Sequence, residues 1–237
     1  MQPILKVVPK PTVHLDPERV VERPEAAAQV THCIAAFSRV ETTMSSLFVN
    51  LLNTNIAAGA DLYRDMQTAS AKEAALSSLA ASALSAQELP AFHSLLKVVK
   101  TARKTRDKYA HWYWGICEEV DDGLALIDPR YLMTYRASIL DNRSCGIMSG
   151  ANLDLSEVYL VRVKGLAADA AHFKQVNNLV FGVANMAAET NKKKRAERLQ
   201  QLFHDALLNT SQSPEPRATR QKTQTVRQVP PGKPHRK

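Results

Sequence analysis

Three residues whose side chains suit phosphate chemistry stand close together in one predicted helix: Arg106, Asp107 and His111. The guanidinium of arginine stays charged and offers a rigid fork of donors that fits phosphate oxygens. Histidine exchanges a proton near neutral pH, so it can act as a general acid or base. The same three side chains also suit a structural hydrogen-bond cluster, and the sequence leaves both interpretations open.

The spacing of these residues limits how they can cooperate. Arg106 and His111 are five positions apart, which places them about 140° apart around a regular helix. They need a local distortion of the helix, or a second copy of the chain, to act on one bond, so we expect a homodimer. Asp107 and His111 are one turn apart and can touch directly. Glu41, midway along the first predicted helix, either reaches the Arg106 region or faces solvent.

Apolar residues recur at spacings of three and four along most of the chain, which predicts a mainly helical fold. Serine followed three residues later by glutamate predicts helix starts at Ser70 with Glu73 and at Ser85 with Glu88. The last predicted helix begins near residue 167 and extends to about 208. The four helices predicted before it cover residues 24–52, 56–66, 70–84 and 85–117, and the fourth carries the three candidate residues.

Two short apolar segments, 124–127 and 158–163, interrupt the helical pattern and are predicted to pair as a small β ribbon. Residues 141–156 between them are rich in Asn, Ser, Gly and Asp and are predicted to form a loop. We therefore expect a mainly α fold, an up-and-down helical bundle with a two-stranded β insertion before the last helix. The expected divisions are an extended, proline-rich N-terminal arm over 1–24, a helical domain over 25–208 with its β insertion at about 121–163, and a disordered basic tail over 209–237.

The formal net charge of +8 is spread unevenly. From Asn209 onward the chain has seven basic residues and one acidic residue, Glu215. This segment carries a net charge of +6, which leaves about +2 for the rest of the chain. The high isoelectric point therefore describes the tail more than the folded body. The basic run at 192–195 lies either on a solvated helix face or against nucleic acid. The candidate nucleic-acid contacts are Lys192, Lys193, Lys194, Arg195, Arg217 and Arg220.

Several functional classes find no support in the sequence. The three cysteines, Cys33, Cys117 and Cys145, are odd in number and lack metal-ligand spacing, so we expect no metal and a reducing, cytoplasmic environment. Because no glycine-rich phosphate loop is present, no nucleotide cofactor is expected. There is no run of 18 apolar residues and no secretion signal, so no membrane association is expected.

The segment from Arg106 to His111 resembles the Arg-x4-6-His motif of HEPN domains, in which a polar residue such as Asp107 often follows the arginine. The resemblance in helix order extends over roughly residues 25–208 and implies a HEPN-like helical bundle. Many HEPN proteins are metal-independent ribonucleases that act as dimers, with both copies of the motif in one cleft. By this resemblance His111 is the general acid or base, Arg106 stabilises charge on the phosphate, and Asp107 orients one of them.

The resemblance leaves two functions open. One is a metal-independent endoribonuclease that acts on RNA through a dimeric Arg/His site. The alternative is a non-catalytic helical dimerisation or interaction module whose basic tail binds nucleic acid or another acidic partner, since many HEPN members keep the fold without cleaving RNA. Trp112 and Trp114, which follow the motif, are either core anchors or platforms on which bases stack.

Overall fold

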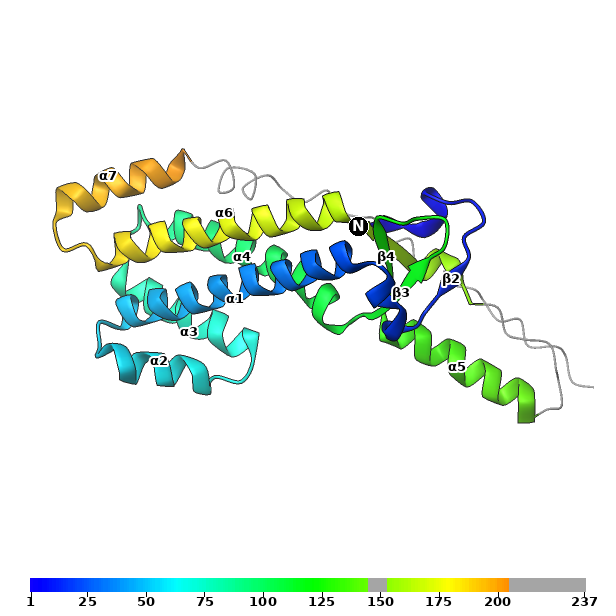
Figure 1. Cartoon of the computed structure of the whole chain (residues 1–237). Helices are drawn as coiled ribbons and strands as arrows, with labels where there is room; N and C mark the ends of the chain where they lie inside the picture. The colour runs from blue at the N-terminus through cyan, green and yellow to red at the C-terminus, as the bar shows by residue number, and fades with distance from the viewer. Residues whose placement is uncertain (145–152, 205–237) are drawn as a thin grey trace, which may run out of the picture.

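Helices carry most of the chain, and a small antiparallel sheet lies at one end of them (Figure 1). The computed structural model describes residues 1–144 and 153–204. The predicted mainly α fold with a β insertion is confirmed. The helices are α1 (Pro24–Leu52), α2 (Ile56–Asp65), α3 (Ala69–Ala83), α4 (Leu89–His111), α5 (Pro129–Ser144), α6 (Val163–Ala188) and α7 (Lys192–Phe203).

The long helices α1 and α6 lie side by side along the length of the bundle, and α4 packs against both (Figure 1). Each presents an apolar stripe to a shared core, in which Phe37 of α1 meets Phe173 of α6 edge to face at 5.5 Å. The predicted end of α1 is confirmed, because Asn53 adopts the left-handed conformation (φ 51°) that closes helices. Asn55 then caps α2, its side chain accepting the N–H of Ala57.

The starts of the next two helices differ from the predicted capping boxes. Thr68 rather than Ser70 caps α3, because its hydroxyl accepts the N–H of Ala71 at 3.1 Å. Glu88 accepts both the N–H and the hydroxyl of Ser85, at 2.7 and 2.9 Å, so this pair does form ahead of α4. The helix predicted from 167 to about 208 begins at Val163 and is broken into α6 and α7.

In the part of the chain that the structure describes, the sheet has five strands rather than the predicted two, in the order β1-β5-β4-β3-β2, all antiparallel. The strands are β1 (Gln2–Pro3), β2 (Val13–His14), β3 (Tyr113–Cys117), β4 (Gly123–Ile127) and β5 (Val158–Arg162). The predicted ribbon of the two apolar segments is confirmed as the β4–β5 pair. The fourth helix ends at His111 rather than near Cys117, because the aromatic and β-branched residues that follow it form β3.

The N-terminal segment is not a free arm. It supplies both edge strands, the 3₁₀ turns η1 (Ile4–Lys6) and η2 (Pro17–Glu22), and a fully buried Ile4. Both carboxylate oxygens of Glu119 accept the N–H of Thr12 at 3.0 Å and fix the segment to the end of β3. The prolines prevent a long helix, as expected. The apolar residues between them pack on one face of the sheet.

Two cores lie on opposite faces of the sheet. In β4, Leu124 and Leu126 join the core of the helical bundle, whereas Ala125 and Ile127 join a second core with the N-terminal segment and Leu132 of α5. Because β4 is covered on both faces, all five of its residues are buried. The predicted loop over 141–156 overlaps the end of α5, and its central part falls in 145–152, outside the described residues. The predicted disordered tail also lies outside them.

Candidate functional site

Arg106 is held at the margin of the bundle by contacts from two helices. Its Nη2 lies 2.9 Å from Oε1 of Glu41 on α1, and its Nη1 lies 3.3 Å from Oδ1 of Asp107. The guanidinium also covers the ring of Phe37 at 4.9 Å. Glu41 thus reaches the arginine, one of the two positions predicted for it. Only 19% of the Arg106 side chain is exposed, so the guanidinium has a fixed orientation and two carboxylates beside it.

His111 is the last residue of α4 and is exposed to solvent. Within residues 1–144 and 153–204, no hydrogen bond or ion pair involves its imidazole. Asp107, one turn before His111 and able to reach it, forms its ion pair with Arg106 instead. The imidazole remains accessible for exchange of protons with a bound molecule.

The three candidate residues are brought together around one open hollow of about 270 Å³. It lies between α1, the C-terminal half of α4 and the segment that joins α2 to α3. The charged or titratable residues that line it are Glu41, Lys72, Arg103, Arg106, Asp107 and His111. The tryptophans do not cover this hollow: Trp114 stacks on Tyr109, Trp112 packs on Tyr159, and both contact the bundle core. Both are partly buried against the core, the arrangement expected of core anchors.

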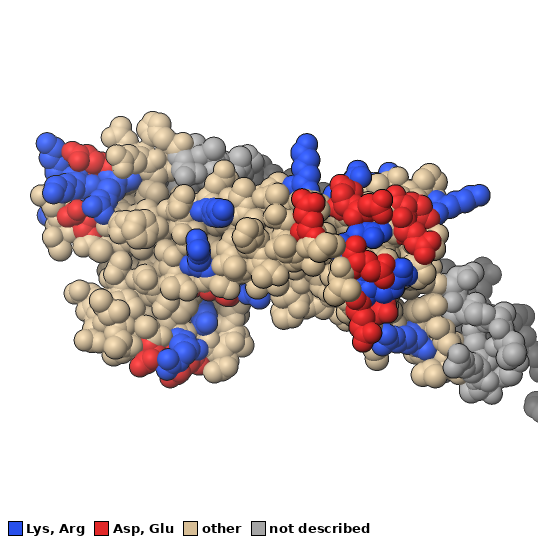
Figure 2. All heavy atoms as spheres, in the orientation of Figure 1, with Lys and Arg blue, Asp and Glu red and all other residues tan. Residues whose placement is uncertain are grey.

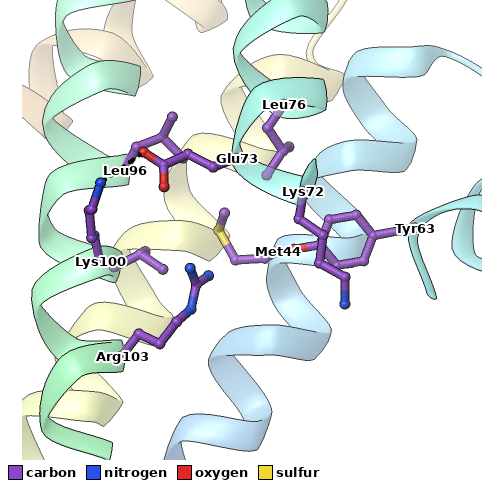
Figure 3. Close-up of a pocket in the computed structure, with 9 residues that line it drawn as sticks. Met44, Tyr63, Lys72, Glu73, Leu76, Leu96, Lys100 and Arg103 are labelled. Atoms are coloured by element: carbon purple, nitrogen blue, oxygen red, sulfur yellow. Dashed lines mark ion pairs between the residues drawn. The ribbon is translucent and has the colours of Figure 1, made fainter. Parts of the chain in front are cut away.

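Sequence reasoning missed two cations in this hollow, Lys72 and Arg103. Figure 3 shows Arg103 extending from α4 towards Met44 of α1, with Lys72 beside Tyr63 on the other side. The Lys72 ammonium lies 4.7 Å from the centre of the Tyr63 ring. Neither cation forms an ion pair with a carboxylate in the part of the chain that the structure describes. Arg103 is one turn before Asp107 and so was detectable from spacing, but Lys72 comes from another helix.

Neighbouring groups define where this basic region ends. Lys100, one turn before Arg103, lies 3.7 Å from Glu73 (Figure 3), so its charge is partly balanced. Burial raises the pKa of the Tyr63 hydroxyl to about 12, although the nearby positive charge of Arg103 opposes this shift. Tyr63 therefore stays protonated at neutral pH and adds no negative charge to the hollow.

Helix α7 lies at the other end of α4. Lys192, Lys193 and Lys194 are exposed there, and Figure 2 shows the basic side chains gathered over this helix. The Arg195 side chain is less available to contact nucleic acid, because its Nε and Nη2 donate to the buried carboxylate of Glu88. Since Glu88 precedes α4 and Arg106 lies near its end, roughly 27 Å of helix separates the two regions. Arg217 and Arg220 lie outside the described residues.

Among the residues that the structure places, no group of three or more His, Cys, Asp or Glu side chains could hold a metal ion. Cys33 and Cys117 are buried and unpaired with each other. In the same ranges no helix combines the length and apolar character that crossing a membrane would require.

Comparison with known proteins gives no family assignment. No family model, no curated protein and no solved structure matches this chain.

Proposed function

We propose that this chain is a HEPN-like, metal-independent endoribonuclease that acts as a homodimer. The observation that supports it best is that Arg106, Asp107 and His111 line one solvent-open hollow, together with the cations Lys72 and Arg103. A concave, basic surface with an accessible imidazole suits a single phosphodiester better than it suits a purely structural cluster.

Each residue has a role that its contacts allow. The exposed His111 takes the proton from the ribose 2′-hydroxyl or gives one to the leaving oxygen. Arg106 carries five N–H donors. Nη2 donates to Glu41 and Nη1 forms an ion pair with Asp107, while the buried Nε has no partner among the described residues. The remaining N–H groups of the two Nη atoms bind a phosphate oxygen as negative charge develops. Asp107 and Glu41 hold the guanidinium in that orientation.

The homodimer is proposed for a geometric reason. Both residues line the hollow, but no hydrogen bond among the described residues joins Arg106 to His111, and residues five apart on a regular helix point about 140° apart. A second copy, placed with its own α4 across the hollow, brings the partner's imidazole towards this Arg106 by symmetry. A C2 dimer has the self-complementary interface that this arrangement needs.

The test is cleavage of RNA in the presence of EDTA. Purified protein is expected to cut RNA and leave a 2′,3′-cyclic phosphate, and His111→Ala is expected to reduce the rate by about 10²–10⁴-fold. His93→Ala is the matched control, because His93 is an exposed histidine on the same helix but does not line the hollow. The proposal is wrong if the wild-type protein cuts no RNA, or if His111→Ala and His93→Ala cut equally well.

One observation favours a second candidate function, a non-catalytic interaction module. Arg106 already has two carboxylates beside it, Glu41 and Asp107, which more than offset its charge, as in an ion-pair cluster that only fixes helix packing. This candidate predicts binding without cleavage, with the basic tail supplying affinity for a polyanion. Deleting residues 209–237 should then remove most of the salt-dependent binding, whereas an RNase site in the hollow would retain its activity on short RNA.

A further inference from the structure

Lys72 and Arg103 have no role in the reaction proposed above, yet they lie in the same hollow. Both residues line the 270 Å³ hollow and also a smaller cavity of about 10 Å³. A space of that smaller size holds about one water molecule, so of the two only the open hollow has room for a phosphate. Ala69, in the first turn of α3, lines the hollow as well, and helix N-termini favour anions.

The spacing along α4 separates Arg103 from His111 of the same copy. Arg103, Asp107 and His111 follow one another at intervals of four residues on one side of α4. With a rise of 1.5 Å per residue, Arg103 and His111 are about 12 Å apart along the axis. One phosphate cannot contact both ends of this stripe, whereas consecutive phosphates of one strand can.

We propose that Lys72 and Arg103 form a second phosphate subsite, which binds a phosphate adjacent to the one that is cut in a single-stranded RNA. This inference rests on the proposed function and extends it. The hollow of about 270 Å³ between α1, α3 and α4 is too small to enclose a duplex, whereas a single strand can bend to place successive phosphates in it. Beyond Arg103 the Glu73–Lys100 pair balances the charge, and the subsite therefore ends after one phosphate.

The first experiment measures binding and does not depend on cleavage. The affinity of a fluorescein-labelled, uncleavable 2′-deoxy octanucleotide is measured against salt for the full chain, for Lys72→Gln/Arg103→Gln, and for the control Lys97→Gln/Lys104→Gln. The control removes the same charge from exposed α4 positions outside the hollow. The subsite variant should bind about tenfold more weakly, the contribution of one charge-assisted hydrogen bond. Its log–log salt slope should fall by about 0.7 for one lost phosphate contact on a single strand.

Equal salt slopes for the two double variants, with both folded, would overturn the subsite. Binding of a poly-glutamate peptide with the same dependence on Lys72 and Arg103 would overturn the assignment to RNA.

A second experiment separates the subsite from the reaction. Wild-type protein should cut a trinucleotide (two phosphates) more efficiently than a dinucleoside monophosphate (one phosphate), and Lys72→Gln/Arg103→Gln should abolish that preference. Equal cutting of both substrates by wild type would refute the subsite and leave the proposed ribonuclease intact. No cutting of either, together with the expected change in salt slope, would refute the ribonuclease and leave a phosphate-binding site.

Discussion

The ion pair between Glu88 and Arg195 is expected to be the strongest electrostatic contribution to the stability of this fold. The Glu88 side chain is 6% exposed and that of Arg195 is 24% exposed. Nη2 of Arg195 lies 2.9 Å from Oε2 of Glu88, and Nε donates to the other oxygen. The pair joins α7 to the start of α4, two elements that share few other contacts.

Arg195→Met keeps the aliphatic stem of the side chain but leaves the Glu88 carboxylate buried without its cation. Removing one partner of a buried pair costs about 3–5 kcal/mol. We expect the lower end, about 3 kcal/mol, because the N–H and hydroxyl of Ser85 still donate to Glu88. For a chain of this size each kcal/mol lowers Tm by about 2–4 °C, so differential scanning calorimetry should show a decrease of roughly 6–12 °C.

The double variant Glu88→Gln/Arg195→Met provides the control. The amide that replaces the carboxylate is neutral, and its oxygen can still accept from Ser85. The double variant should therefore be more stable than Arg195→Met alone, with a loss of about 1 kcal/mol relative to wild type. A double variant as unstable as the single one would show that lost packing, and not an unpaired charge, explains the effect.

The pH dependence gives an independent check on the same pair. Burial acts to raise the pKa of Glu88, but hydrogen bonds from Arg195 and Ser85 outweigh it and lower the pKa below the ordinary value of 4.5. A carboxyl group whose pKa is lowered by folding stabilises the fold above its unfolded pKa, and this stability is lost as the pH falls through the folded pKa. The stability that the pair gives to the wild type is therefore lost as the pH falls through the lowered folded pKa of Glu88, so wild type and Arg195→Met should differ less in stability at pH 3 than at pH 7. A difference that is unchanged between pH 7 and pH 3 would refute the reasoning.

The remaining predictions concern glycines and cysteines of the interior. A Cβ at Gly115 would lie 2.1 Å from the backbone oxygen of His14, so Gly115→Ala should separate β2 from β3, cost about 1–3 kcal/mol and speed amide exchange in the N-terminal segment. Gly165→Ala is the control, because its nearest neighbour is 3.8 Å away and alanine suits a helix, so it should be neutral or stabilise by up to about 1 kcal/mol. Burial raises the pKa of the Cys33 thiol to about 12 and that of the Cys117 thiol to about 11, so iodoacetamide at pH 8 should alkylate both only after unfolding, as mass spectrometry of the labelled peptides would show.

The helices were predictable because their signals are local. The apolar stripe of α1 and the asparagines at 53 and 55 lie within one contiguous segment, and both periodicity and capping act over a few residues. The sheet was predicted only in part for the opposite reason. Pairing of β2 with β3 joins residues about a hundred positions apart, and no pattern within the first 24 residues specifies that partner.

The candidate site shows the same division between local and distant information. Arg106, Asp107 and His111 were found because they belong to one helix. Lys72 was missed because the turn between α2 and α3 brings it to the hollow from another part of the chain. The direction of the Asp107 side chain was also not predictable. It depended on whether Arg106 or His111 came within reach, and in the structure the carboxylate lies beside Arg106, whose guanidinium covers the ring of Phe37.

The rotation of α4 and the position of its end are fixed by contacts that do not involve His111. The role of His111 in the reaction can therefore be tested separately from its effect on folding. The rotation of α4 is set by its buried face, where Tyr109 donates to Asp169. Its end is set by β3, whose Tyr113 pairs with Ile127 of β4 immediately after the helix. Neither constraint uses the imidazole of His111, which is exposed and has no partner among the residues placed by the structure. The free energy of unfolding of His111→Ala should therefore lie within about 0.5 kcal/mol of that of wild type, as is usual for surface substitutions. Arg106→Met should be less stable, because it leaves Glu41 and Asp107 without their cation. If His111→Ala loses RNA cleavage while its thermal unfolding is unchanged, the loss belongs to the reaction and not to the fold; a matching loss of stability would remove that argument.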